Sequence, residues 1–102
     1  VVDARNGLVV PPRLLSRVRP QYTPEGMRRR IQGTVVLDAI VNADGTVGDV
    51  MVTKALDGGA WGLDDEAVNA AKQWTFAPAS RNGTPVAARV RLETEFTLRQ
   101  SN

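Results

Sequence analysis

The stretch from Leu63 to Pro78 constrains the fold most, because it carries the pattern of one amphipathic helix with a start and a stop. Asp64 is the predicted N-cap, since a short carboxylate accepts hydrogen bonds from the free N–H groups of a first helical turn. Pro78 cannot continue a helix, so the helix is expected to end near Trp74. Its small apolar residues would let it lie close to a sheet. The apolar stripe follows helical spacing at Leu63, Ala67, Ala70, Ala71 and Trp74.

Two alternating segments ahead of this helix are predicted to form a β-hairpin. Thr34–Asn42 carries apolar residues on both faces, which suits a strand that has neighbours on both sides in its sheet. The turn Asn42–Gly45 follows, with a glycine that supplies the positive φ. Val47–Lys54 returns as the partner strand, and its alternation changes parity near Gly48, which indicates a bulge.

The closing segment, Val86–Leu98, alternates cleanly between core-type and charged residues. One of its faces is therefore expected to meet the core and the other to meet water, and the charges suit an edge strand. A short helix, capped by Thr23 and with Pro24 at its first position, is expected to precede the hairpin and to run to about Arg30.

Together these elements predict an α+β fold with the element order α-β-β-α-β. We expect a small two-layer sandwich, in which a three-stranded antiparallel or mixed sheet of order 2-1-3 carries two helices on one face. The crossover helix brings the third strand back beside the first, and this arrangement leaves the third strand at an edge of the sheet.

Charge is distributed unevenly along the chain. Residues 1–33 hold seven arginines against two acidic residues, a net charge of +5, whereas residues 34–102 hold six basic and nine acidic residues, a net charge of −3. Prolines interrupt the opening segment at Pro11, Pro12 and Pro20. We therefore expect residues 1–16 to form an extended, loosely held arm and residues 17–102 to form one folded domain. No apolar run is long enough to span a membrane.

The chain has neither cysteine nor histidine, which excludes several kinds of site. A disulfide scaffold, a thiolate zinc site and a serine–histidine triad are all ruled out. The acidic run Asp64–Glu66 suits a helix start better than a metal site or an acid–base pair, and Asn42–Gly45 lacks the spacing of a calcium loop. Since no set of nucleophile, base and oxyanion donor can be named, we expect no enzymatic activity, no cofactor and no metal.

Short motifs follow one another in a fixed order over about residues 17–98. They are Pro20-Gln21-Tyr22, Gly33-x-Val35-x-Leu37, Asp44-Gly45-x-Val47-x-x-Val50-x-Val52, Leu63-Asp64-x-x-Ala67, Trp74-x-Phe76-x-Pro78-Ala79 and Gly83-x-Pro85-Val86, and the alternating strand to Phe96 ends the series. In this order and register the chain resembles the C-terminal domain of TonB, the energy transducer of Gram-negative envelopes.

This resemblance implies a periplasmic domain of a protein that is anchored in the inner membrane of a Gram-negative bacterium. Such a domain binds a short segment, the Ton box, of an outer-membrane transporter, and proton-driven motor proteins of the inner membrane supply force through the same chain. The transporter segment adds as a strand to the edge of the sheet, so that main-chain hydrogen bonds give affinity and side chains give selectivity. Uptake of iron–siderophores or of cobalamin is the transport role that the resemblance suggests.

By the same resemblance the closing strand is the expected docking edge, and the segment Arg19–Tyr22 is expected to lie beside the docked peptide. A proline at Leu92 or Thr94 is expected to abolish docking, because it removes a main-chain donor or distorts the edge. The predicted partner-binding residues are Arg19, Pro20, Gln21, Tyr22, Val90, Arg91, Leu92, Glu93, Thr94, Glu95 and Phe96.

Two other functions stay open on the sequence. The domain could be an envelope adaptor that uses its sheet edge to recruit another partner, or to form a homodimer by strand exchange. It could instead be a small basic nucleic-acid binder that works through Arg13–Arg30, although only Tyr22 lies near Arg28–Arg30 to stack on a base. The charges on the closing strand are either a solvated face or a selector of the docked peptide.

Overall fold

The main sheet is organised around its central strand, β3 (Gly33–Val41). In the computed structural model, which describes residues 1–3, 7–56 and 58–98, alternate side chains of β3 are buried. Val35, Leu37 and Val41 are completely buried and form the middle of the core. The strand predicted over residues 34–42 is thus confirmed, and it has neighbours on both sides, as its two apolar faces indicated.

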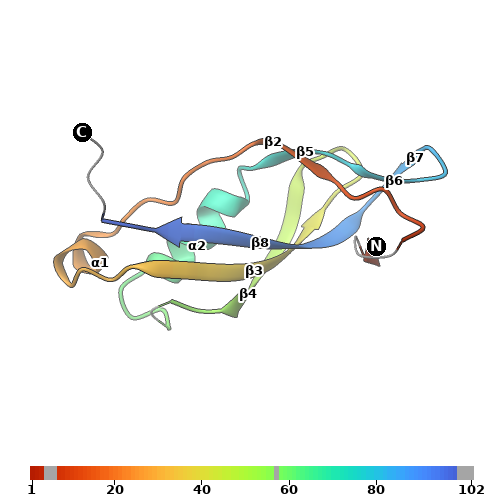
Figure 1. Ribbon diagram of the computed structural model, residues 1–102. Helices are drawn as coiled ribbons and strands as arrows, with labels where there is room; N and C mark the ends of the chain where they lie inside the picture. Colours follow the sequence, from red (N-terminus) through yellow and green to blue (C-terminus); the bar gives the residue numbers. More distant parts are fainter. Residues whose placement is uncertain (4–6, 57, 99–102) are drawn as a thin grey trace.

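Two antiparallel strands flank β3, namely β8 (Ala88–Phe96) on one side and β4 (Val47–Lys54) on the other. The full sheet order is β1-β8-β3-β4 (Figure 1). The three predicted strands therefore follow the expected order 2-1-3. The register of β4 against β3 shifts near Gly48, which confirms the expected bulge. The two-residue strand β1 (Val2–Asp3), which the sequence did not indicate, runs parallel to the start of β8.

The turn between β3 and β4 is held by Asp44 and Gly45. The carboxylate of Asp44 accepts hydrogen bonds from the main-chain N–H and the hydroxyl of Thr46, at 3.0 and 2.6 Å. Gly45 has a φ of 90°, and a Cβ built there would lie 2.1 Å from the carbonyl oxygen of Phe76. Both the conformation and the close approach require glycine at this position.

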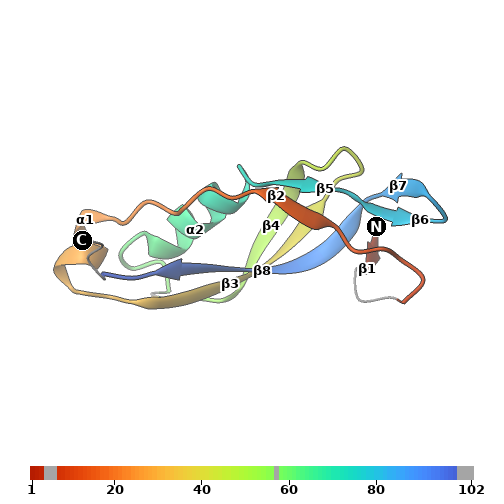
Figure 2. The ribbon, with the colours of Figure 1, turned by 45° about the horizontal axis from the view of Figure 1, so that its top comes forward.

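Helix α2 (Leu63–Ala71) covers one face of the sheet, where it contacts β3, β4 and β8 (Figure 2). Ala67 and Ala71 are completely buried, so the small side chains bring the helix close to the strands, as the stripe predicted. The helix ends at Ala71, and a tighter turn carries the chain on to Trp74, whose N–H bonds the carbonyl of Ala71 at 3.1 Å.

Asp64 is not the N-cap of α2, and this prediction was wrong. Gly62, in the left-handed conformation with a φ of 80°, holds that position without a side-chain cap. Asp64 lies inside the first turn and is buried, and its carboxylate accepts hydrogen bonds from the N–H groups of Leu56 at 2.8 Å and Gly59 at 3.0 Å. The carboxylate therefore satisfies donors of the preceding loop instead of donors of its own helix.

Helix α1 (Pro24–Arg28) begins as predicted, because the Thr23 hydroxyl accepts the N–H of Gly26 at 3.0 Å. The helix lies beyond the end of the sheet and not on the face that α2 covers (Figure 1 and Figure 2). A Cβ at Gly26 would lie 2.8 Å from the side chain of Leu63, so α1 packs against the start of α2. The expectation of two helices on one face is corrected accordingly: one covers the face and the other closes the end.

Parts of residues 1–16 are extended and pair with distant strands, so these parts are held more firmly than the expected loose arm. β2 (Arg13–Ser16) pairs antiparallel with β5 (Thr75–Ala77), and Val10 forms a bridge to Ser80. Val9 is buried in a second, small apolar cluster beside β8. These partners lie far away along the chain, so local alternation carried no sign of them. A domain boundary at residue 16 stays a prediction.

A hairpin of β6 (Ala79–Arg81) and β7 (Thr84–Val86) forms one end of the elongated molecule, which measures 49 × 30 × 19 Å. Asn82 and Gly83 form the turn of this hairpin with φ values of 51° and 80°, as in a type I′ turn. The N-terminus lies at this same end (Figure 1). Among the described residues, no helix is long and apolar enough to cross a membrane.

Candidate functional site

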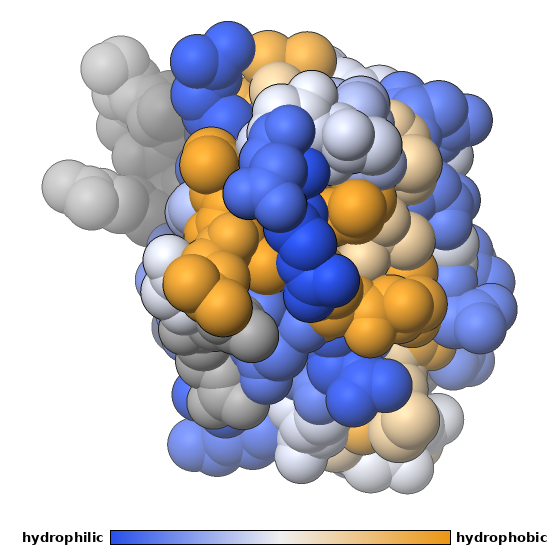
Figure 3. Space-filling model, turned by 90° about the vertical axis from the view of Figure 1, so that its right-hand side faces the viewer, coloured by the Kyte–Doolittle hydropathy of each residue, from blue (hydrophilic) through white to orange (hydrophobic). Residues whose placement is uncertain are grey.

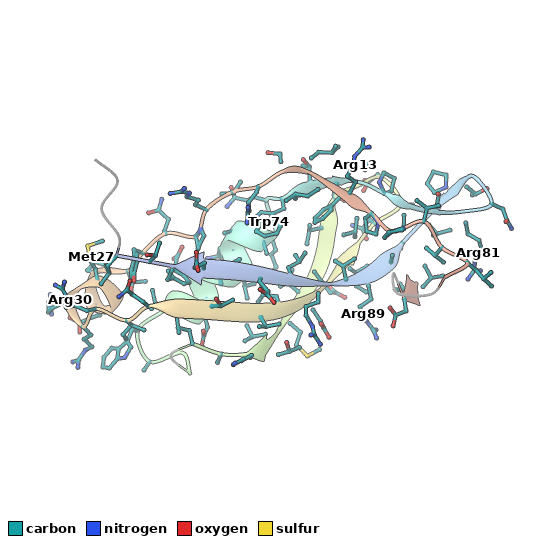
Figure 4. The ribbon with its side chains drawn as sticks, in the orientation of Figure 1. Arg13, Met27, Arg30, Trp74, Arg81 and Arg89 are labelled. Carbon is teal, nitrogen blue, oxygen red and sulfur yellow. The ribbon has the colours of Figure 1, made fainter. Side chains whose placement is uncertain are left out.

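A groove of about 490 Å³ runs along the C-terminal half of β8, and we call it the β8 groove. The segment between β2 and α1 forms one wall, the end of β8 forms the other, and Trp74 lies between them (Figure 4). The lining residues are Arg17, Arg19, Pro20, Tyr22, Trp74, Thr94, Glu95, Phe96 and Thr97.

Trp74 fixes the wall of the groove that is formed by the segment between β2 and α1. Its indole Nε1 donates a hydrogen bond to the carbonyl of Val18 at 2.9 Å, and the guanidinium of Arg17 lies 5.7 Å from its ring centroid. Since Trp74 is also packed in the main core, it ties an otherwise extended segment to α2 and the sheet. The sequence predicts Trp74 as a core residue, and the structure gives it a second place in the groove.

Tyr22 joins the two walls at the end of the groove nearest α1. Its ring meets that of Phe96 edge to face, with centroids 5.3 Å apart and planes at 75°. Its hydroxyl donates a hydrogen bond to the carbonyl of Ile31, at the exit of α1. Partial burial raises the pKa of the Tyr22 phenol, so the hydroxyl stays protonated and remains a donor at neutral pH.

Thr94 is the unsatisfied polar group of this site. Its side chain is 2% exposed, and within the described part of the chain its hydroxyl has no hydrogen-bond partner. A buried hydroxyl without a partner costs about 1–3 kcal/mol. Because Thr94 lines the groove, a polar atom of a bound ligand can supply the missing partner.

The outer edge of β8 presents main-chain groups at alternate residues. The N–H of Val2 in β1 donates to the carbonyl of Ala87 at 3.0 Å, so odd-numbered residues point their main-chain groups away from β3. The register between β3 and β8 runs unbroken from Ala88 to Phe96, which keeps this parity along the strand. The outward set beyond β1 is therefore Arg91, Glu93 and Glu95.

This parity corrects the proline expectation. The N–H groups of Leu92 and Thr94 point to β3, so a proline there would break the internal ladder of the sheet. A proline at Glu93 would instead remove an N–H from the free edge. Within the described residues, β8 has a second neighbour only where β1 pairs with Ala88 and Arg89.

The structure brings the predicted partner-binding residues together in two sets. Arg19, Pro20 and Tyr22 face Thr94, Glu95 and Phe96 across the β8 groove. The other four strand residues precede Thr94 in β8 and lie outside the groove; they are Val90, Arg91, Leu92 and Glu93. Leu92 is buried, and the side chains of Arg91 and Glu93 are exposed. Gln21 is exposed and does not line the groove.

Three lining residues were absent from the predicted set, namely Arg17, Trp74 and Thr97. Thr97 lies inside the predicted closing strand and directly follows Phe96, the last predicted partner-binding residue. Arg17 precedes the predicted segment Arg19–Tyr22 by two positions, so only the limits of the predicted set were misjudged. Trp74 carried no sequence signal for the groove, since its place there depends on the extended segment crossing the end of α2.

Two other surfaces stand apart from this groove. In the basic run that ends α1, Glu25 pairs with Arg28 and Arg29, and the Arg29 guanidinium lies 3.8 Å from the ring centroid of Trp61. At the opposite end, apolar surface gathers around charged side chains (Figure 3), and the exposed apolar residues of the nearby N-terminal segment include Leu8 and Val10. No group of acidic side chains in the described ranges could hold a metal ion.

Comparison with known proteins gives one consistent family. Residues 18–98 match the family described as Gram-negative bacterial TonB protein C-terminal. Protein TonB of Xanthomonas campestris pv. campestris is 38% identical over 79 residues, which cover 78% of this chain and 34% of that protein. Protein TonB of Vibrio cholerae is 35% identical over 92 residues, covering 89% of this chain and 37% of that protein. The chain thus spans about a third of the length of these relatives.

A solved structure has the same fold. The solution NMR structure of the Pseudomonas aeruginosa TonB CTD superposes with a TM-score of 0.68, covering 98% of this chain and 96% of that one, at 21% sequence identity. The likeness confirms the α+β architecture.

Proposed function

The chain belongs to the family of C-terminal domains of Gram-negative bacterial TonB proteins, and from this premise we propose that it is the protein-binding domain of a TonB-like energy transducer. It docks a short segment of an outer-membrane transporter, the Ton box, as an added strand on the outer edge of β8. Force from a proton-driven motor of the inner membrane reaches the transporter through the same chain. The domain therefore acts in the periplasm, as part of a protein anchored in the inner membrane.

The observation that carries this proposal is the regular outer edge of β8. Arg91, Glu93 and Glu95 each direct a main-chain N–H and C=O away from β3, at a spacing that an extended peptide matches. β1 already uses the same edge, since it pairs with Ala88 and Arg89. The edge thus accepts a strand from its own chain and leaves the following residues for a guest.

The β8 groove gives the docked strand a place for its side chains. A strand added beside β8 alternates its side chains between the two faces of the sheet, and those on the α2 side enter the groove. There the arginines Arg17 and Arg19 and the hydroxyl of Thr94 offer polar contacts, while Trp74 and Tyr22 offer apolar surface. Main-chain bonds on the edge then supply affinity, and these side chains supply selectivity.

A proline at Glu93 tests the docking edge. The Glu93→Pro variant removes an outward N–H without breaking a bond to β3, so the fold survives while a docked strand loses a donor and meets the pyrrolidine ring. We expect the affinity for a Ton box peptide, measured by isothermal titration calorimetry, to fall at least about tenfold, or about 1.4 kcal/mol. Circular dichroism checks that the variant is folded.

Glu93→Ala is the matched control, because it removes the same side chain and keeps the N–H. It should bind the peptide within about threefold of the unchanged chain, as expected for an exposed charge. A folded Glu93→Pro variant with unchanged affinity would overturn the docking edge. If the unchanged chain binds no Ton box peptide at all, the envelope adaptor becomes the better assignment.

A further inference from the structure

The end of the molecule that holds the N-terminus presents exposed aliphatic side chains among charged ones (Figure 3). Of the seven large apolar residues that are exposed in the described ranges, five lie within residues 1–16. Leu8 and Val10 are 81% and 63% exposed, and Val10 lies beside the β6–β7 hairpin through its bridge to Ser80. With Arg13 and Arg81 they form what we call the N-terminal patch. We propose that this patch binds the surface of a membrane that contains anionic phospholipids.

The charge of this end favours an anionic partner. Arg13 in β2 and Arg81 in β6 are both exposed, and Arg81 lies at the hairpin end of the molecule (Figure 4). The strands β1, β2, β6 and β7 contain one acidic residue, Asp3, which lies opposite Arg89 in the register of β1 and β8. Residues 7–24 hold three arginines and no acidic residue. Cations therefore outnumber anions around the patch, which suits the phosphates of lipid headgroups.

The apolar residues of this end are aliphatic, which favours lipid over other anionic partners. At a membrane surface, aliphatic side chains enter the boundary between headgroups and acyl chains while arginines stay beside the phosphates. Residues 7–16 and 79–86 contain no aromatic residue, so the bases of a nucleic acid would have no side chain to stack on. Tyr22, which follows in the same basic stretch, packs edge to face against Phe96. Protein partners likewise use aromatic anchors.

The place of the patch leaves the docking edge accessible. The N-terminus and the patch lie at one end of the molecule, whereas the β8 groove extends toward α1 at the other (Figure 1). A domain that rests on a bilayer through the patch can therefore still receive a guest strand. That this bilayer is the inner membrane rests on the proposed function, in which the domain belongs to a protein anchored there. The affinity for anionic lipid depends on the patch alone.

Co-sedimentation of the 102-residue chain with lipid vesicles tests this inference. Vesicles of phosphatidylcholine with about 30% phosphatidylglycerol should bind the chain, and pure phosphatidylcholine vesicles should bind it at least about fivefold less. The pair Leu8→Gln with Val10→Gln removes apolar surface, and the pair Arg13→Gln with Arg81→Gln removes the cations. Each pair should lower the partition coefficient for the anionic vesicles at least about tenfold. Added salt should weaken the binding of the unchanged chain.

The matched control is the pair Arg28→Gln with Arg30→Gln, which removes two exposed cations at the opposite end. It should bind the anionic vesicles within about threefold of the unchanged chain, and circular dichroism checks that every variant is folded. A chain that does not bind the anionic vesicles, or equal losses in the control pair and the patch pairs, would overturn the inference. Binding of a single-stranded oligonucleotide that needs the two patch arginines, with vesicle binding absent, would assign this end to nucleic acid instead.

Peptide binding separates this inference from the proposed function. The pair Leu8→Gln with Val10→Gln should bind a Ton box peptide with the affinity of the unchanged chain, because neither residue lines the β8 groove. Vesicle binding by a chain that binds no such peptide would remove strand docking and leave the patch standing. Peptide binding without vesicle binding would do the reverse.

Discussion

The two edges of the main sheet differ in regularity and surroundings. On the β8 side the register with β3 is unbroken over the whole strand, and a groove with a rigid wall lies next to it. On the β4 side the register shifts twice, between Val36 and Leu37 and between Ala39 and Val41. Bulges interrupt the regular spacing of main-chain groups and protect an edge from strand addition. The comparison teaches that a usable edge needs regular spacing and a supporting wall, and only the β8 side has both.

Among the variants that test the difference between the two edges, removal of the Trp74 side chain should lower the free energy of unfolding most. Trp74→Ala takes a core side chain away from the β8 side and releases the wall at Val18, so we expect the free energy of unfolding to fall by about 3–5 kcal/mol. Chemical denaturation measures the loss. Met51→Ala on the exposed side of β4 is the control and should change stability by less than about 0.5 kcal/mol. Equal losses at the two positions would mean that Trp74 does not support the β8 side specifically.

Loss of the Asp64 carboxylate should weaken the β4 side and spare the β8 edge. Asp64→Ala removes the carboxylate that accepts hydrogen bonds from the N–H groups of Leu56 and Gly59 in the loop that follows β4. We expect a loss of about 1–3 kcal/mol in the free energy of unfolding, measured by urea denaturation, with peptide affinity unchanged. The neighbour Asp65, which is exposed, is the matched control as Asp65→Ala. A fall in peptide affinity for the folded variant would show that the two sides are coupled.

The smallest effect is expected at the turn between β3 and β4. Hydrogen bonds from the side chain and then the main chain of Thr46 lower the pKa of Asp44 below 3.8, its ordinary value. Because the folded pKa is lowered, the stabilisation is complete above pH 3.8 and is lost as the pH falls through the folded value. The stability difference between the unchanged chain and Asp44→Asn should therefore shrink below pH 3.8, as urea midpoints at a series of pH values would record. A difference that stays constant with pH would contradict this role.

Local patterns predicted those elements whose cause lies within a few residues. The hairpin of β3 and β4 follows from alternation and a turn glycine, and the cap at Thr23 follows from a capping hydroxyl; both are confirmed. The stripe of α2 was confirmed for the same reason, since its spacing fixes which side is apolar. These features need no knowledge of what lies across the molecule.

Predictions failed where the partner is distant in sequence. Residues that read as a loose arm are held by β5 and β8, and Asp64 serves a loop instead of its own helix. The wall of the β8 groove depends on a hydrogen bond between Trp74 and Val18, which are 56 positions apart. The segment around Val18 is rich in proline and arginine, and its residue pattern does not indicate a hydrogen bond to a distant tryptophan.

The sequence by itself determined the alternation of β8, and therefore which of its side chains enter the core and which stay in water. It also determined the order of charges along the strand, in which Arg89 and Arg91 precede Glu93 and Glu95. Only the tertiary structure decided which main-chain groups face outward, because that parity depends on how β3 and β1 pair with the strand. The face on which a side chain lies follows from its hydrophobicity, which is a property of the residue itself. Whether a main-chain N–H or C=O is hydrogen-bonded depends on which strands lie next to it in space.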